Sequence, residues 1–271
     1  MAVDLMIQEN DRLVRQDIIT QTDGYKVSNR YVAIATQDVL TEIENYTGTQ
    51  PIITGFNNAN VRKAEKNGFQ KHALICEMPN AEMVDGTKMN MILFNSNDRS
   101  TSLKIFMGSL RAACSNQCVW GEQIAEPVSI RHTQKDWKHS IHSLMDAYEE
   151  TQRQTQEMIN RMMSRYVSYG DMGRFAERVN EEILEPEITG TIFDPMQLNM
   201  AHRKEDIGKD LWHTYQRIQY NVLQGGIDRL IEKADEEGVL FDTISKTHKV
   251  TDTTKQIDFN RKLHSIAMEV L

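Results

Sequence analysis

The chain of 271 residues contains no long apolar run. No window approaches the roughly 20 apolar residues that a membrane-spanning helix requires. The first residues, Met1-Ala-Val-Asp-Leu5, also lack the charged and apolar regions of a secretory signal. We therefore expect a soluble protein of the cytoplasm.

Cysteine is scarce, and its odd count argues against a disulfide framework. Cys114 and Cys118 are four residues apart and would share one face of a helix. A redox or metal pair is one interpretation. Two thiols without histidines at ligand spacing are more often small buried hydrophobic residues, and we favour that interpretation for these two.

The common catalytic motifs are absent: the chain has no phosphate-binding G-x-x-x-x-G-K-[ST], no G-x-G-x-x-G, no H-E-x-x-H and no G-x-S-x-G. We expect neither an enzyme nor a cofactor. His139 and His142, with His132 or Asp136, could hold a metal ion, but histidines at a helix end more often face solvent, and we expect no metal site. An unrecognised catalytic site would involve residues that more often tie a turn to a sheet, namely Asn95, Asp98, Arg111, Arg131 and His132.

The charge is negative overall but unevenly distributed. The formal net charge is −8, whereas residues 51–142 hold 11 Lys+Arg against 8 Asp+Glu. An acidic chain does not coat nucleic acid by bulk attraction. A basic middle within acidic flanks instead favours one localised contact with a polyanion.

The apolar pattern predicts an α+β fold: a small, mostly antiparallel sheet packed by helices, followed by a long-helix C-terminal half. We expect two domains, a core over 1–132 and a helical region over 133–271, with 1–30 forming an arm or hairpin. Strands are predicted over 31–35, 51–56, 72–78, 88–94 and 126–132. In the first half, helices are predicted over 37–46, with Thr36 as N-cap, and from about Ser102 to Cys114. In the second half, helices are predicted from Thr133 to Tyr166 and over 175–184, 204–224, 227–237 and the last residues. The stretch 246–255 is expected to be mobile.

Cations, asparagines and aromatic rings gather in the predicted loops of the basic middle. Such a combination is typical of loops that follow a phosphate backbone and stack bases, although asparagines also cap their own turns while cations lie in solvent. The candidate nucleic-acid-binding residues are Phe56, Asn57, Asn58, Asn60, Arg62, Lys63, Lys66, Phe69, Lys71, Arg99, Lys104, Arg111, Arg131 and Lys138.

The run from Phe94-Asn95-Ser-Asn-Asp98-Arg99 to Cys114-Ser-Asn116 resembles the core motif of the phage/plasmid-like family of unknown function. The segment Asp210-Leu-Trp212-His-Thr-Tyr215 to Gly226 is similar to that family's closing helix. Arg99 stands where the family pattern has glycine, and Val222 where it has alanine. The resemblance implies an accessory protein of a bacteriophage or plasmid, with no established reaction.

Two functions remain open. The first is a phage protein that binds or anneals single-stranded DNA in replication or recombination. The second is a phage protein-binding factor, an anti-defence inhibitor or a transcription cofactor, that acts on a host or phage partner through its acidic helical half. We also expect a homo-oligomer, because long helices rich in methionine favour a partner.

Overall fold

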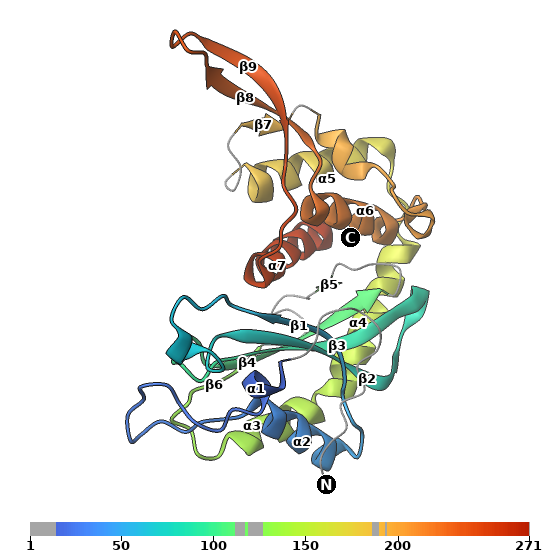
Figure 1. Cartoon of the computed structure of the whole chain (residues 1–271). Coiled ribbons are helices and arrows are strands. Elements are labelled where there is room, and N and C mark those ends of the chain that lie inside the picture. Colours follow the sequence, from blue (N-terminus) through green and yellow to red (C-terminus); the bar gives the residue numbers. More distant parts are fainter. Residues whose placement is uncertain (1–14, 112–116, 119–126, 186–189, 193, 271) are drawn as a thin grey trace. The chain divides into compact units, whose positions relative to one another are not determined.

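A computed structural model describes residues 15–111, 117–118, 127–185, 190–192 and 194–270. The fold is α+β, as predicted. The chain forms two compact units (Figure 1), one of residues 1–109 and 122–154 and the other of residues 110–121 and 155–271. The units therefore divide after Gln154, whereas the pattern had suggested a boundary after His132.

The first unit is built on an antiparallel sheet. Its strand order is β1-β2-β3-β4, and β6 pairs with the start of β4. The predicted pairing of 72–78 with 88–94 is confirmed, with Leu74 opposite Leu93. The strands are β1 (Ile52–Asn58), β2 (His72–Glu82), β3 (Thr87–Asn95), β4 (Leu103–Arg111) and β6 (Val128–Ile130).

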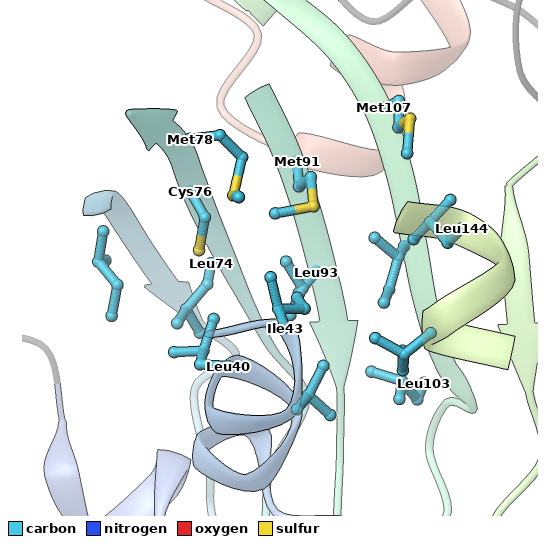
Figure 2. Packing of buried hydrophobic residues seen from close by; sticks show 14 of the residues in the cluster. Leu40, Ile43, Leu74, Cys76, Met78, Met91, Leu93, Leu103, Met107 and Leu144 are labelled. Atoms are coloured by element: carbon cyan, nitrogen blue, oxygen red, sulfur yellow. The ribbon is translucent and has the colours of Figure 1, made fainter. Parts of the chain in front are cut away.

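Two helices cover one face of this sheet, α2 (Thr36–Thr47) and α3 (Trp137–Asp146). Figure 2 shows Leu40 and Ile43 of α2 packed toward the side chains of β2 and β3. Because side chains alternate along a strand, every second residue of β2, β3 and β4 reaches this core. A short helix, α1 (Gln16–Ile19), adds Ile18 and Ile19.

The predicted helix after Ser102 is wrong, since these residues form strand β4. Leu103, Ile105 and Met107 are buried in the core, whereas Lys104 is exposed, which is the two-residue period of a strand. Of the two residues between them, Lys104 is charged but Phe106 is apolar, so the apolar run Ile105-Phe106-Met107 hides the alternation from which a strand could be predicted.

Two further predictions in this unit are wrong. Residues 31–35 form no strand and are held by a bond from the Val32 N–H to the His132 carbonyl (2.7 Å). The N-cap of α2 is Ala35, without a side-chain cap, and Thr36 is instead bonded inside the protein. The predicted strand over 126–132 is limited to β6 among the described residues.

The predicted long helix from Thr133 is interrupted. Helix α3 begins at Trp137 after a turn, without a cap from Thr133, and ends at Asp146, with Ala147 as C-cap. Helix α4 (Tyr148–Ser164) follows directly.

The second unit is mostly helical. Its helices are α5 (Tyr169–Val179), continued by one π-helical turn, η3 (Asn180–Leu184), then α6 (Leu211–Gln224) and α7 (Thr253–Val270). Strand β5 (Gln117–Cys118) follows β4 in the order of the first sheet. A separate sheet of order β7-β8-β9 is formed by β7 (Thr191–Ile192), β8 (Asp228–Ala234) and β9 (Leu240–Lys246). Four short 3₁₀ turns occur in the described chain: η1 (Ala64–Lys66), η2 (Val84–Gly86), η4 (Pro195–Asn199) and η5 (Lys204–Asp206).

The helix predicted over 227–237 is wrong, because these residues form β8 of a hairpin with β9. The predicted break at Gly225-Gly226 is confirmed, and Gly225 has a φ of 71° at the end of α6. Helix α6 begins at Leu211, with Asp210 as N-cap, rather than at Lys204. Gly170 and Gly173, predicted to interrupt, lie within α5. No helix in the described part of the chain is both long and apolar enough to cross a membrane.

Candidate nucleic-acid interface

The loops predicted to bind nucleic acid meet at one end of the first unit's sheet. In an antiparallel sheet the end of β1, the start of β2 and the end of β3 coincide, and the register pairs His72 with both Asn58 and Asn95. Loops 59–71 and 96–102 therefore adjoin. A bond from the Asn97 N–H to the Phe69 carbonyl (2.9 Å) joins them directly.

The start of β4 and the end of β6 lie at this same end, since Leu103 pairs with Ile130. The arm before residue 32 is attached here as well, by a bond from the Tyr25 N–H to the Asn97 carbonyl (2.7 Å). Four segments that are distant in sequence thus converge: the arm, 59–71, 96–104 and 130–131. The cations that these segments carry, which we call the cationic rim, are Lys26, Arg62, Lys63, Lys66, Lys71, Arg99, Lys104 and Arg131.

Most of the rim faces solvent without an ion pair. The side chains of Arg62, Lys63, Arg99, Lys104 and Arg131 are exposed, and no ion pair is found for them among the described residues. Of the acidic residues in the same segments, Asp17 is paired with Arg15, which leaves Asp23, Glu65 and Asp98. Eight cations against three carboxylates leave a local excess of five positive charges in a chain whose net charge is −8.

One pair within the rim is partly satisfied. Lys66 Nζ lies 3.5 Å from Asp98 Oδ2. Partial burial opposes ionisation of Asp98, but the bonds from Ser100 and the charge of Lys66 outweigh it and lower the pKa of Asp98. Asp98 therefore stays charged and offsets Lys66, so this lysine contributes less to the surface than its exposed neighbours.

Aromatic rings accompany the rim cations. Phe69 is half-buried and its ring lies 5.8 Å from that of Tyr25, at a tilt of 46°. The ammonium groups of Lys26 and Lys66 lie 5.2 and 5.6 Å from the centre of the Tyr25 ring. Neither Tyr25 nor Lys26 was predicted; the aromatic–cation pair beside the Asp23-Gly24 turn is the signal that could have indicated them.

Arg99 occupies a backbone conformation that suits glycine. Its φ is 66°, in the left-handed region. This explains why the family pattern has glycine at that position. The tight turn of 98–101 is kept in this chain, with the Ser100 N–H bonded to Asp98 Oδ1 (3.0 Å), and the arginine adds a cation to its tip.

The three predicted asparagines lie beside the rim, at the end of β1. Asn57 and Asn60 are exposed, and Asn58 is half-buried. Asn58 Nδ2 donates to the Ala59 carbonyl (3.2 Å), which is the local capping role considered for such residues.

Three predicted residues do not join the rim. Phe56 is 6% exposed and packs in the core, so its ring is not available to stack on a base. Lys138 lies on α3 and is paired with Glu42 (2.6 Å), which neutralises it. Arg111 ends β4, whereas Lys104 begins it, so about 20 Å of strand separate them; the Arg111 side chain lies outside the described residues.

The polar turn Asn95-Ser96-Asn97 is buried and anchors the loops of the rim. Asn95 Nδ2 donates to the Ile34 carbonyl (2.7 Å) and to Thr36 Oγ1 (3.0 Å). His72 lies 2.7 Å from Thr36 through Nε2 and 3.0 Å from the Gln70 carbonyl through Nδ1. The carbonyl requires a proton on Nδ1, so Thr36 donates to Nε2.

This network is closed to solvent. Thr36, His72 and Asn95 are at most 2% exposed, and burial lowers the pKa of His72 to about 4. The imidazole is therefore neutral, and its nitrogens hold the turn and helix α2 in place.

The remaining polar candidates have structural partners too. His132 stacks on Tyr31 with ring centres 4.9 Å apart, and its Nδ1 bonds to the Val32 carbonyl (3.1 Å). Desolvation lowers the pKa of His132. His142 bonds to Glu42 (2.7 Å) and stacks on Tyr46. Across the described ranges, no group of three potential ligands could hold a metal ion.

Of the cysteines, only Cys76 has a described side chain. It is fully buried in the core, and desolvation raises the pKa of its thiol to about 12. It thus acts as a small hydrophobic residue. The side chains of Cys114 and Cys118 lie outside the described residues, as does Trp120.

Residues 25–263 match the family described as a domain of unknown function (DUF932). In Escherichia coli (strain K12), UPF0380 protein YfjQ is 27% identical over 205 residues, which cover 74% of this chain and 70% of that protein. UPF0380 protein YafZ is 25% identical over 257 residues, which cover 90% and 84%. No solved structure matches the chain. Because the family match spans the rim, both units and most of the sequence, this protein belongs to the DUF932 family of unknown function.

Proposed function

We propose that the protein binds single-stranded DNA through the cationic rim. The observation that supports this most strongly is that four segments carrying eight cations meet at one sheet end of an otherwise acidic protein. Phosphates on a strand release counterions when lysine and arginine neutralise them, so a localised excess of positive charge is sufficient for binding.

The aromatic rings favour an unpaired strand over a duplex. Tyr25 and Phe69 are only half-buried and lie among the cations. A base that is not paired can stack on such a ring, whereas the bases of a duplex are stacked on each other. Acidic charge on the rest of the chain would limit binding elsewhere.

The biological setting is part of the proposal. The likeness to phage and plasmid accessory proteins suggests a role in replication or recombination of a mobile element, where single strands are exposed. Strand annealing further requires that two or more copies act together. The proposal is of a binding protein and includes no reaction.

Fluorescence anisotropy with a labelled oligonucleotide, measured across a salt series, tests the rim. The variant Arg62→Gln/Lys63→Gln/Arg99→Gln/Arg131→Gln removes four exposed cations of the rim. The matched control Lys204→Gln/Lys209→Gln/Lys233→Gln/Lys249→Gln removes four exposed cations of the second unit. Both variants have the same net charge, so only position differs.

We expect the rim variant to bind at least tenfold more weakly and to reduce the slope of log K against log salt by up to about 3, since each phosphate contact contributes about 0.7. The control should bind like the unsubstituted chain. The proposal would be disproved if the unsubstituted chain did not bind the oligonucleotide at low salt, or if both variants lost the same amount of affinity. Duplex DNA and RNA of the same sequence serve as competitors and identify the preferred form.

A single-residue variant separates charge from folding. Arg99→Gly removes a cation at a position whose φ suits glycine, so the turn should remain intact. Binding should weaken while circular dichroism and the unfolding midpoint stay unchanged. A loss of binding accompanied by an altered fold would point to the turn rather than to the charge.

The alternative, a factor that binds proteins through an acidic helical half, has less support. The second unit carries 16 Lys+Arg against 20 Asp+Glu and the first carries 15 against 19, so each has a net charge of −4. Negative charge is thus not concentrated in the helical unit. A pull-down that recovered one host protein, and lost it in a variant of second-unit carboxylates, would favour this alternative.

A further inference from the structure

The outer edge of β9 is open. In the sheet β7-β8-β9, β9 pairs with β8 on one side, and no strand pairs with its other side among the residues that the structure describes. Figure 1 shows the β8–β9 hairpin extending beyond the helices of its own unit. An open edge presents unpaired N–H and C=O groups, which readily accept another strand.

Three of the seven residues of β9 are large, apolar and exposed. Leu240, Phe241 and Ile244 are 61%, 47% and 62% exposed. An isolated two-stranded ribbon is only marginally stable in water, and it gains stability when further strands extend the sheet. The open edge and the apolar side chains therefore both favour an additional strand.

The register of the hairpin places like charges side by side. On one face Leu230 lies opposite Ile244, and on the same face Glu232 lies opposite Asp242. Directly opposed carboxylates destabilise a strand pair. No ion pair is found for either of them within the described part of the chain. A cation beside Asp242 would relieve this repulsion.

A residue of β9 itself, Lys246, could supply such a cation from a second copy. Lys246 is on the same face as Asp242, its side chain is 67% exposed, and it pairs with Asp228 of β8 (3.0 Å). Its exposure leaves room for a second carboxylate on the open side of β9.

We propose that β9 pairs with β9 of a second copy, antiparallel, about a two-fold axis at Ile244. An axis perpendicular to the sheet leaves the same side chains on the same face in both copies. Even-numbered residues of one β9 therefore lie opposite even-numbered residues of the other, and odd opposite odd. Three registers then keep at least five of the seven residues of β9 paired, centred on Asp242, Thr243 or Ile244.

Of the three registers, only the one centred on Ile244 places opposite charges across from each other in the two copies. Centring on Asp242 sets two aspartates opposite each other, and centring on Thr243 sets Asp242 opposite Ile244 of the second copy. Centring on Ile244 sets Asp242 opposite Lys246 of the second copy, twice by symmetry. It also aligns Leu230 and Ile244 of both copies into one apolar row across four strands, which is the cross-strand packing that stabilises sheets.

Cysteine cross-linking tests the register. In the variant Ile244→Cys the two introduced cysteines face each other, with Cα atoms about 4.5 to 5.5 Å apart, within the range of a disulfide. In the control Thr243→Cys they are diagonal neighbours at about 7 to 8 Å, at or beyond the limit. The unsubstituted chain, which has its own cysteines, is oxidised alongside.

We expect a covalent dimer on a non-reducing gel for Ile244→Cys and little for Thr243→Cys. Equal cross-linking of both variants would exclude this register, and no cross-linking of either would exclude the pairing.

A charge exchange tests the contact without cysteines. Asp242→Lys relieves the repulsion from Glu232 within the hairpin, so folding should not suffer, but it sets lysine opposite Lys246 of the second copy. Sedimentation across a concentration series should show dimerisation weakened about tenfold, because two attractive pairs become repulsive. The triple variant Asp242→Lys/Lys246→Asp/Asp228→Lys restores opposite charges between the copies and keeps opposite charges between β8 and β9, so it should restore dimerisation. Unchanged association of the single variant, or a monomeric unsubstituted chain, would overturn the proposal.

Discussion

Two antiparallel hairpins of the protein have opposite surroundings. In the first unit, every residue of β3 but Lys88 is buried, including Met91 and Leu93, and helices α2 and α3 cover one face. In the second unit, β9 is exposed along most of its length. In both hairpins the strands pair with each other, β8 with β9 in one continuous register and β2 with β3 with an irregularity between Glu77 and Glu82.

The difference is in the number of apolar faces. β3 reads Thr-Lys-Met-Asn-Met-Ile-Leu-Phe-Asn, with apolar side chains on both faces of its second half, whereas β9 alternates Leu240, Asp242 and Ile244 on one face with Phe241, Thr243 and Ser245 on the other. The comparison teaches that backbone pairing alone does not determine which hairpin becomes a core. Apolar area that other elements can cover provides most of the free energy.

Leu93→Ala should have the largest effect. Leu93 is fully buried between β2, β4 and the covering helices, as Figure 2 shows for its neighbours. Loss of the side chain leaves a cavity and should lower the free energy of unfolding by about 3 to 5 kcal/mol. Urea unfolding followed by tryptophan fluorescence, to which Trp137 of the same unit contributes, measures it. A loss below 1 kcal/mol would mean that this face is not tightly packed.

Acidification should destabilise the buried hairpin through His72. Its pKa is lowered to about 4 by burial, below the unfolded value of 6.5. The fold favours the neutral imidazole, so stability is complete above pH 6.5 and is lost as the pH falls toward 4. The loss approaches about 3 kcal/mol for a shift of about 2.5 units.

Unfolding midpoints between pH 7 and pH 4 measure this loss. His72→Gln, which cannot be protonated, should show a smaller fall, and an unchanged fall would assign the effect elsewhere. His264 of the second unit, with a pKa also lowered to about 4 by desolvation, accounts for a part that remains.

Substitutions in the turn after β3 should cost more stability than substitutions in the turn between β8 and β9. Asn95→Ala removes bonds to the Ile34 carbonyl and Thr36 and from the Ser96 N–H, all buried, and should cost about 2 kcal/mol. The counterpart is Asp235→Ala in the exposed β8–β9 turn, where Oδ1 accepts from Glu237 and Val239, and it should cost less than about 1 kcal/mol because water replaces the bonds. Urea unfolding of both variants gives the ranking. Equal costs would show that burial of the first turn adds nothing.

Ile244→Ala should have the smallest effect on folding. At 62% exposure the side chain buries little area, so the free energy of unfolding should change by less than about 0.5 kcal/mol in dilute protein. Hydrogen exchange of the β9 amides measures local stability more directly. A large loss would mean that β9 packs against its own chain and is not a free edge.

Part of the candidate interface could be predicted from residue types. The loop over 59–71 was predicted from its asparagines and cations, and it carries four of the rim cations. Lys138 was assigned wrongly because its partner Glu42 is 96 positions away, and a charge pattern contains no information about such a pair. Phe56 was assigned wrongly because the β-bulge between Ile53 and Gly55 changes which residues of β1 face the core.

The wrong predictions of secondary structure also arise from contacts between residues that are far apart in the sequence. Residues 103–111 and 228–234 are apolar or mixed runs that both helix and strand tolerate. For β4 the choice was made by pairing with β3 and β6, and for β8 by pairing with β9. Long-range pairing overrides local preference in such segments.

By itself, the sequence determined the α+β class, helices such as α2, α6 and α7, the pairing of β2 with β3 and the basic character of the middle, because periodicity and local charge are properties of neighbouring residues. Tertiary structure alone decided which cations meet at one sheet end, that Phe56 and Lys138 are excluded from it, and that β9 keeps an open edge. Those outcomes depend on strand register and burial, and both arise from contacts between residues far apart in the chain.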